Sequence, residues 1–453
     1  MSARDSVRRA LERAGYRFIQ DEPHVPKGQN KSPPSKSNST FRPDVLAWAA
    51  DPDGKLVPWA VVEIKNRSVM LPPEVALPQL ARSRDTFGTV DHYVVLQDVW
   101  YQADTGLRKF TRVDGPIPPR YGGKGELDDV DLATTLLTEQ LWRWAQTQSP
   151  YDKSADAYGA LRFDVGQSTE LRIDGIETAT GTVLPASREV LWEARRRALV
   201  GFARRGREAG IYTSHPVIAK AVAHLAGSKL DNEVFDPFCG TGSFLWESID
   251  HSRDIGSGLV SAVGLDLNYR MVELARSIAR AAPIDVQIYN VDAFTVETLS
   301  ETEMSDPHES RLFNCAVSAP PMSLKLNRSE PYELLDGTMT RDGDFAAVDC
   351  LVRQLAEGGR AVVQIAPGFT FRRNGERYRN YLANSFRVAV LIGCPPGSVP
   401  GFGLASIIMV IEKAPPTETF VAQLGEDWES QLAPGGAALE AALNHINQRG
   451  GRR

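Results

Sequence analysis

The chain has 453 residues, of which 42% are hydrophobic and 24% charged, and its formal net charge is −6. This length favours two domains with substantial cores, and the acidic balance excludes a surface that attracts nucleic acid everywhere, so DNA contacts require local basic patches. Four cysteines without metal-knuckle spacing favour a reducing compartment. Because no signal peptide opens the chain and no apolar run approaches the roughly 20 residues of a membrane helix, we expect a cytoplasmic protein without a membrane partner.

Residues 1–150 are predicted to form the first domain. Its predicted elements are a helix over 6–14, strands over 45–49, 59–64 and 92–96, and a helix over 131–146. The turn signal Asp51-Pro-Asp-Gly54 separates the first two strands and predicts that they are neighbours. Residues 151–190 show no strong period and are predicted to connect this domain to the next one.

Two acids and a lysine stand at the ends of the first two predicted strands. Asp44 precedes the first strand, and alternation along the second places Glu63 and Lys65 on one face. Two carboxylates on adjacent strands can hold Mg²⁺ through oxygen, and a lysine beside them can stabilise charge on a phosphodiester. The alternative is a solvated Glu–Lys pair on an edge strand.

The Pro-Asp44 and Glu63-Ile-Lys65 arrangement resembles the PD-(D/E)xK nuclease superfamily, which includes the N-terminal part of type I restriction subunits. The resemblance implies an N-terminal α/β restriction-endonuclease-like domain that cuts DNA with Mg²⁺. It implies that Asp44, Glu63 and Lys65 are catalytic and that Asp44 and Glu63 bind the metal. Glu12 on the first helix and Gln79 are further candidates for this site.

From residue 187 to about residue 413, helix-like and strand-like segments alternate, which predicts a parallel α/β sheet. We place the second domain at 191–413. The remaining residues, 414–453, are predicted to form a tail with one helix over 437–448.

One short apolar strand of this domain runs into a glycine turn that opens a helix. The segment reads Val234-Phe-Asp-Pro-Phe-Cys-Gly-Thr-Gly-Ser-Phe-Leu245, and its glycines, Gly240 and Gly242, let the backbone approach a ligand. The new helix presents free N–H groups to a carboxylate. S-adenosylmethionine (SAM) has an amino-acid end, so we expect Asp236 to take its ammonium and the turn its carboxylate. A tight turn or a nicotinamide site is the alternative, although Leu245 stands where a dinucleotide fingerprint has its third glycine.

Two further acids end the next predicted strands. Asp266 follows Gly242 at about the spacing at which an acid meets ribose hydroxyls. Asp292 is placed to accept from an adenine amino group. The alternative for both residues is a cap on the local strand end.

Five more segments resemble the sequence blocks of N6-adenine methyltransferases and of type I modification subunits: Ile211–Ala219, Gly343–Ala347, Glu357–Gly368, Leu391–Gly397 and Ile407–Ile411. The resemblance covers residues 190–413 and implies a Rossmann-like class I SAM-dependent methyltransferase sheet. It also implies SAM as cofactor, DNA as partner and a separate specificity or defence subunit. The further cofactor-binding residues that it implies are Tyr212, Thr213, Phe238 and Thr241.

The chain departs from these enzymes after its fourth strand. They carry a polar residue, two prolines and an aromatic, where the polar group accepts from the adenine amine and the ring stacks on the flipped base. Here the catalytic positions are Ala319, Pro320, Pro321 and Met322. The missing hydrogen bond costs about 1–3 kcal/mol and the missing stacking a similar amount, so we expect slow or absent methylation. Ser318 is a substitute acceptor only through a register change.

The sequence therefore predicts a restriction-modification or phage-defence protein that combines a nuclease-like and an adenine-methyltransferase-like domain. Two alternatives stay open, namely an active N6-adenine DNA methyltransferase subunit and a non-catalytic SAM- or DNA-sensing subunit. One arginine run is either a phosphate track or a solvated helix face. It comprises Arg195, Arg196, Arg197, Arg204, Arg205 and Arg207.

Overall fold

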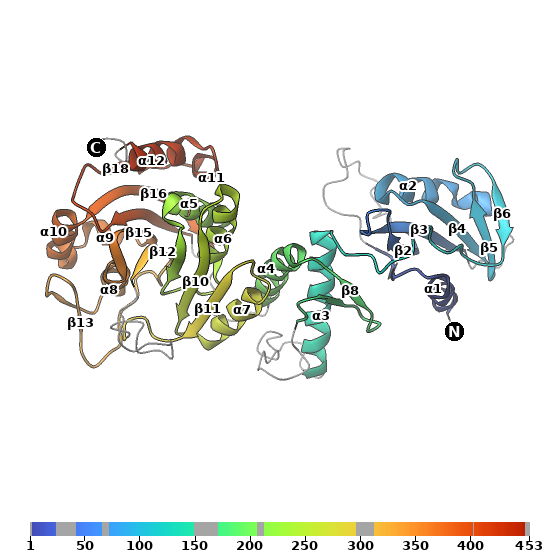
Figure 1. Ribbon diagram of the computed structural model, residues 1–453, viewed down its shortest axis with the longest axis horizontal. Coiled ribbons are helices and arrows are strands. Elements are labelled where there is room, and N and C mark those ends of the chain that lie inside the picture. The colour runs from blue at the N-terminus through green and yellow to red at the C-terminus, as the bar shows by residue number, and fades with distance from the viewer. Residues whose placement is uncertain are drawn as a thin grey trace. The chain divides into compact units, whose positions relative to one another are not determined.

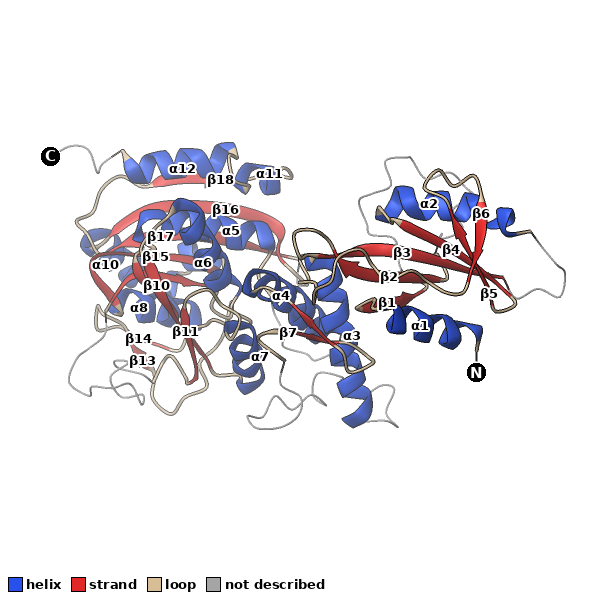
Figure 2. Ribbon diagram, turned by 45° about the vertical axis from the view of Figure 1, so that its right-hand side comes forward, coloured by secondary structure: helices blue, strands red, loops and turns tan. Residues whose placement is uncertain are grey.

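The computed structural model describes residues 2–23, 42–65, 72–148, 171–205, 213–295, 312–401 and 403–448. The chain divides into two compact units, Met1–Ala198 and Leu199–Arg453. Figure 1 shows that each unit has a sheet of its own, and Figure 2 shows helices lying against each sheet. Within the described ranges, no helix is long and apolar enough to cross a membrane.

The N-terminal unit contains a six-stranded sheet in the order β1-β2-β3-β4-β5-β6. Its strands are β1 (Phe18–Asp21), β2 (Val45–Ala50), β3 (Leu56–Lys65), β4 (Asp91–Leu96), β5 (Val99–Ala103) and β6 (Phe110–Val113). Only β3 and β4 pair in parallel. The other elements are α1 (Ala3–Ala14), α2 (Leu77–Phe87), α3 (Val130–Gln148) and the hairpin β7 (Gly175–Glu177) and β8 (Val183–Pro185). The predicted helices and strands of this unit are thus present, mostly with longer bounds.

The first helix shows why these residues fold as they do. Ser2 and Asp5 form a reciprocal capping box at its start, and Gly15 ends it in the left-handed conformation. Val7 and Leu11 are buried in the same core as alternate residues of β2 and β3. This packing fixes α1 on one face of the sheet.

The C-terminal unit contains an eight-stranded sheet in the order β11-β10-β9-β12-β15-β17-β16-β18. The strands are β9 (Asn232–Asp236), β10 (Leu259–Asp266), β11 (Asp285–Asn290), β12 (Phe313–Ser318), β15 (Leu355–Ile365), β16 (Arg387–Val399), β17 (Leu404–Glu412) and β18 (Phe420–Gln423), with a separate small pair β13 (Tyr332–Glu333) and β14 (Met339–Thr340). The helices that begin the unit are α4 (Arg188–Arg205, shared with the N-terminal unit), α5 (Pro216–Ala226), α6 (Ser243–Ile255) and α7 (Tyr269–Ala279). Those that follow are α8 (Gly343–Arg353), α9 (Gly368–Phe371), α10 (Glu376–Ser385), α11 (Trp428–Leu432) and α12 (Ala437–Asn447).

This sheet is parallel only in part. Strands β9, β10, β11, β12 and β15 run in parallel, as the alternation predicts, but β17 is antiparallel to both of its neighbours. The predicted parallel α/β sheet is therefore present in five strands but does not extend to β17, because the short connection between β16 and β17 suits an antiparallel pair. Beyond residue 413, β18 pairs with β16 and extends the sheet.

The five parallel strands end at one edge of the sheet. The segments that follow them are 237–242, 267–268, 291–295, 319–323 and 366–372. In open α/β sheets, ligands bind beyond the carboxyl ends of the strands. The predicted cofactor residues from Asp236 onward and the predicted catalytic residues lie at or just beyond these strand ends, whereas Thr213 precedes α5.

Candidate functional site

Three polar side chains meet at the ends of β2 and β3 in the N-terminal unit. The antiparallel register makes Asp44 and Glu63 neighbours across the two strands. Lys65 donates to Glu63 Oε2 at 2.8 Å, and its Nζ lies 3.9 Å from Asp44 Oδ2. The same Asp44 oxygen accepts from the main-chain amide of Ile64 at 2.8 Å. The structure thus brings together the three residues that the sequence singled out, and we call them the carboxylate cluster.

Glu63 is the buried member of the carboxylate cluster, with a side chain only 3% exposed. Burial raises the pKa of Glu63 to about 6, although Lys65 acts in the opposite direction. Its Oε1 atom has no hydrogen-bond partner among the described residues. An unpartnered buried oxygen beside a second carboxylate matches the oxygen ligands that Mg²⁺ prefers. The fit rests on two protein ligands, because no three His, Cys, Asp or Glu side chains gather into a metal site within the described part of the chain.

The first helix supplies a cation to this cluster. Arg4 Nη2 lies 3.5 Å from Asp44 Oδ1, and Arg4 also donates to Glu22. Glu12 stands about two turns further along α1 and lines a separate pocket, while Gln79 is exposed on α2. Glu12 therefore does not complete the cluster, and the sequence pattern missed Arg4.

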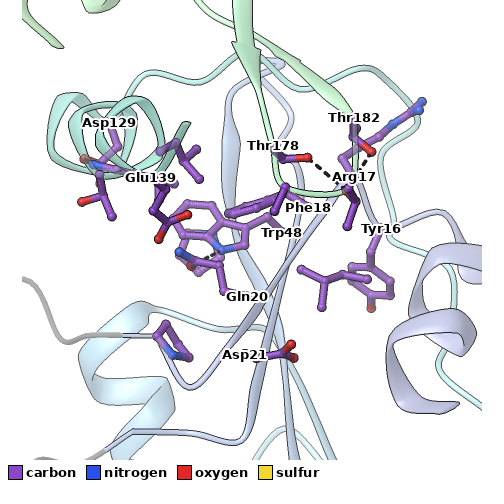
Figure 3. Close-up of a pocket in the computed structure, with 18 of the residues that line it drawn as sticks. Tyr16, Arg17, Phe18, Gln20, Asp21, Trp48, Asp129, Glu139, Thr178 and Thr182 are labelled. Carbon is purple, nitrogen blue, oxygen red and sulfur yellow. Dashed lines mark hydrogen bonds between the residues drawn. The ribbon is translucent and has the colours of Figure 1, made fainter. Parts of the chain in front are cut away.

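The pocket that Glu12 lines has a volume of about 1140 Å³. Figure 3 shows Trp48 and Gln20 at its centre, with Asp129, which directly precedes α3, and Glu139 of α3 to one side. Gln20 accepts from Trp48 Nε1 at 2.9 Å, which fixes the indole in the pocket. None of the carboxylate-cluster residues lines this pocket, so it is distinct from the cluster.

In the C-terminal unit, Asp236 ends β9 with a carboxylate that is almost fully buried. Its Oδ1 accepts from Phe238 N at 3.0 Å and from Ser318 Oγ at 2.6 Å. Burial raises the pKa of Asp236 to about 7, and nearby Asp266 acts in the same direction. A buried acid of this kind is stabilised in its charged form when a cation binds beside it.

The turn after Asp236 requires its glycines. Gly240 and Gly242 have φ angles of 54° and 83°, in the region that strains other residues. A Cβ on Gly242 would lie 2.2 Å from the ring of Trp246, whose indole donates to Thr241 O at 2.7 Å. Gly242 is also the N-cap of α6, and no side chain caps this helix. The first-turn N–H groups of α6 are therefore suited to an anion.

Asp266, at the end of β10, braces this turn. Its Oδ2 accepts from Gly240 N at 2.8 Å, and its Oδ1 accepts from Asn268 N at 2.7 Å. Burial raises the pKa of Asp266. Each carboxylate oxygen can accept a second hydrogen bond, so Asp266 can hold the turn and still accept from a ligand hydroxyl.

The sequence did not single out two apolar side chains, Phe294 and Leu267, that lie close in the chain to the acids at the strand ends. Asp292 Oδ1 accepts from Phe294 N at 3.0 Å, and the Phe294 ring lies 5.2 Å from that of Phe238. Leu267, directly after Asp266, is 71% exposed. The available signal was their position one or two residues beyond an acid that ends a strand.

The other predicted cofactor residues are Thr213, Thr241 and Tyr212. Thr213 and Thr241 are buried, and Thr241 Oγ1 shares a hydrogen bond with Ser243 Oγ at 3.3 Å. Tyr212 lies outside the described residues.

The loop after β12 contains the predicted catalytic positions. Ser318 is fully buried and its hydroxyl donates to Asp236, so the register change that would let it replace Ala319 is wrong. Pro320 is buried, whereas Pro321 is exposed and Met322 half-buried. The position that carries the polar acceptor in adenine methyltransferases therefore remains an alanine.

A family comparison agrees with this geometry. The sequence model of the N-6 DNA Methylase family matches residues 189–428, which is more than half of the chain. The chain belongs to the N-6 DNA Methylase family. The match contains the Asp236 turn, the loop after β12 and every strand of the large sheet.

Individual proteins align with only part of this N-6 DNA Methylase family member and at low sequence identity. It is 26% identical over 223 residues to the methylase subunit of the type I restriction enzyme MpnII of Mycoplasma pneumoniae, covering 46% of the chain but 41% of that subunit. It therefore spans less than half the length of this relative. A tRNA (guanine(10)-N2)-dimethyltransferase of Methanothermobacter thermautotrophicus is 31% identical over 112 residues, which cover 24% of this chain and 27% of that enzyme.

The fold itself is similar to a solved structure. A Listeria monocytogenes protein assigned to the class I S-adenosylmethionine-dependent methyltransferases aligns with a TM-score of 0.50 and 16% identity, covering 70% of this chain and 99% of that one. At this identity the likeness concerns the fold alone. It agrees with the predicted class I methyltransferase sheet.

Three arginines of the predicted run have described side chains, and all three interact with other residues of this N-6 DNA Methylase family member. Arg195 is buried and donates to the carbonyl oxygens of Leu171 and Arg172. Arg197 pairs with Glu193 and with an aspartate at the start of α3. Arg196 also pairs with Glu193. Nothing is described of the side chains of Arg204 and Arg205, and Arg207 lies outside the described residues. A continuous phosphate track through Arg195 is therefore wrong, because a buried guanidinium does not reach DNA.

Proposed function

We propose that this N-6 DNA Methylase family member binds SAM in the turn after β9 and acts on DNA in a cytoplasmic restriction-modification or phage-defence system. The observation that carries the proposal is an uncapped helix start beside a buried acid, Asp236. The amides of the first turn of α6 suit a carboxylate, and Asp236 suits an ammonium group. An amino-acid end carries both groups, and a nicotinamide dinucleotide carries neither.

The rest of the proposed cofactor site follows the neighbouring strand ends. Asp266 would accept from ribose hydroxyls while it braces Gly240. Asp292 would accept from the adenine amine, and Phe294 and Leu267 would contact the faces of the adenine ring. This assignment uses one polar and one apolar contact at each strand end, which is how pockets fix both orientation and affinity.

The proposed reaction is methyl transfer to the N6 amine of adenine, for which bound SAM supplies the methyl group. The chain itself has to hold the amine, and main-chain carbonyls of the loop 318–322 are its available acceptors. Because Ala319 adds no side-chain acceptor and Met322 no ring, we infer slow transfer, with a deficit of about 1–3 kcal/mol for the missing hydrogen bond. A subunit that senses SAM or DNA without turnover is the alternative. The match to a type I methylase subunit supports a separate specificity or defence subunit as partner.

Calorimetric titration and labelled-methyl transfer test this proposal together. SAM and its demethylated product should both bind with saturation, and transfer to mixed duplex DNA should be slower than about 1 per second. Binding without any transfer would favour the sensing subunit. A flat titration of well-folded protein would reject the proposed SAM site.

A second activity is favoured by the carboxylate cluster. We propose that Asp44, Glu63 and Lys65 form a nuclease site that uses Mg²⁺, and the supporting observation is the unpartnered buried Oε1 of Glu63. Asp44 and Glu63 would hold the ion, which would supply charge stabilisation and an activated water when bound. Lys65, already within 2.8 Å of Glu63, would stabilise charge on the phosphate.

Incubation with linear and supercoiled DNA tests the nuclease proposal. Nicking or cleavage should require Mg²⁺ and stop on addition of a chelator, with Ca²⁺ as a control for non-specific divalent effects. Cleavage that continues with excess chelator would reject a metal-dependent site in this cluster. Absence of any cleavage, with an intact fold and with mixed DNA that includes methylated and unmethylated substrates, would also count against it.

A further inference from the structure

An exposed aromatic ring lies at the edge of the large sheet that holds the proposed SAM site. The short helix α9 (Gly368–Phe371) follows β15, one of the five parallel strands that end at this edge. Phe369 is buried, with its ring 4.9 Å from that of Phe345. Phe371, two residues further on, is 70% exposed. The helix is therefore anchored in the core through one ring and presents another to solvent.

The next residue, Arg372, links the end of α9 to the loop after β12 through its side chain. Its Nη2 donates to Ser323 Oγ at 3.2 Å, and its Nη1 lies 2.9 Å from Asp344 Oδ2. The other oxygen of Asp344 accepts from Ser323 N at 2.8 Å. Arg372 also folds closely over Gly368, where an added Cβ would meet its Nε at 2.5 Å. Three elements are thus joined around Ser323, which directly follows Met322.

One exposed cation, Arg373, lies two residues from Phe371 in the sequence. Arg372 pairs with both Asp342 and Asp344, so its single positive charge offsets one of their two negative charges. Arg373 is exposed and has no ion-pair partner within the described part of the chain. A solvent-facing ring beside an exposed cation is an arrangement with which proteins stack unpaired bases while they hold the phosphate backbone.

We infer that Phe371 is the stacking surface for an unpaired DNA base at the loop 318–323, in place of the ring that Met322 lacks. The inference rests on the proposed SAM-dependent function, because it assigns to Phe371 the target strand of that reaction. The ring supplies stacking to the base but no acceptor for its amine. Affinity for the base and the rate of transfer are therefore set by different residues.

Binding of a fluorescent single-stranded oligodeoxynucleotide, measured by anisotropy with SAM's demethylated product present, tests this inference. Phe371→Leu keeps apolar bulk without an aromatic face and should weaken binding about tenfold, whereas Phe371→Tyr should bind within about twofold of the wild type. Val421→Ala, at a position 68% exposed on β18, is the matched control and should bind like the wild type. Arg373→Gln should weaken binding and reduce its salt dependence, while Phe371→Leu should leave the salt dependence unchanged.

Equal affinities of the wild type and Phe371→Leu would overturn the inference, as would equal losses in Phe371→Leu and Val421→Ala. The cofactor titration separates this failure from that of the proposed function. If all variants bind the demethylated product but Phe371→Leu binds the oligonucleotide normally, the role of Phe371 is wrong and the SAM site stands. If the wild type binds no cofactor, the proposed function fails first, and the inference with it.

Discussion

Asp236 and Glu63 are two buried acids at strand ends in different units, and their surroundings give them different chemistry. Burial raises the pKa of both, to about 7 for Asp236 and to about 6 for Glu63. Asp236 is held by a main-chain amide and a hydroxyl, beside an uncapped helix. Glu63 is held by the ammonium of Lys65 and keeps one oxygen without a partner in the described residues.

The difference shows that a buried carboxylate alone does not identify a site. Neutral donors around Asp236 leave a net negative charge that an organic cation can balance, and the nearby helix start accepts a negative group. Under the nuclease proposal, the Glu63 and Asp44 carboxylates would hold a divalent ion and the Lys65 ammonium would face a phosphate. The predictions that follow test whether the two acids differ in this way.

The largest expected effect is the loss of Mg²⁺-dependent cleavage in Glu63→Gln. The amide preserves the shape of Glu63 but removes the charge that holds the ion, so the rate should fall by about a thousandfold, equivalent to several kcal/mol. Lys65→Ala should slow cleavage less and leave metal affinity nearly unchanged. Asp53→Asn, an exposed turn residue of the same unit, is the control. Undiminished cleavage in an Asp44→Asn, Glu63→Gln double variant would end the nuclease proposal.

Asp236→Ala should weaken SAM binding by about 100-fold, because a hydrogen bond to a charged group contributes about 1.5–3 kcal/mol. Asp236→Asn keeps acceptors for the Phe238 amide and the Ser318 hydroxyl, so it should fold like the wild type and still lose most of the affinity. Titration calorimetry and thermal unfolding measure the two effects separately. Wild-type affinity in Asp236→Asn would show that the acid supports the loop and does not meet the ammonium.

The pH dependence of SAM binding should be about tenfold between pH 6 and pH 8. A carboxyl with a pKa of about 7 is mostly protonated at pH 6 and mostly ionised at pH 8, and only the ionised form pairs with an ammonium. Stability should respond in the opposite direction. Since folding raises the pKa of Asp236, the contribution of this carboxyl to the free energy of unfolding is present at low pH and is lost as the pH rises through about 7. Asp236→Asn should show neither pH dependence near pH 7. SAM binding by the wild type that does not change with pH would contradict the pairing of Asp236 with the SAM ammonium.

The smallest expected effect is an increase in the rate of methyl transfer. Ala319→Asn with Met322→Phe restores the side-chain acceptor and should raise methyl transfer about fivefold, corresponding to one net hydrogen bond of about 1 kcal/mol. The ring at position 322 should add little, because Phe371 is inferred to supply the stacking. Scintillation counting of labelled DNA measures the rate. The single change Met322→Leu is the control for altered packing in this loop. Wild-type transfer at about 1 per second or faster would show that the loop needs no repair.

Much of the local structure was predictable because it depends on nearby residues. Apolar runs and turn residues located β2, β3 and α1, and a hairpin register brought Asp44 to Glu63. The glycine turn was also predictable, since left-handed angles and an opening helix have a local signature. These features depend on a few consecutive residues.

The rest depended on contacts between distant segments. Ser318 donates to Asp236, which lies 82 residues away in the sequence. This contact turns the Ser318 side chain toward Asp236, and no local pattern predicts it. The burial of Arg195 depends on carbonyls near residue 171, so a basic run could not be distinguished from a structural arginine. The antiparallel direction of β17 follows from pairing with two strands and leaves little trace in its apolar pattern.

The contact between Gly242 and Trp246 gives the proposed SAM turn an optical signal of its own. The indole is fixed by its bond to Thr241 O and lies directly against the backbone that a ligand carboxylate would approach. A charge that arrives there changes the field across the excited indole, so Trp246 emission should shift as the turn fills. The chain has eight tryptophans, and Trp246→Phe identifies this one by difference. Occupancy of the turn can therefore be followed in unlabelled protein at the wavelength of tryptophan emission, separately from any reaction on DNA.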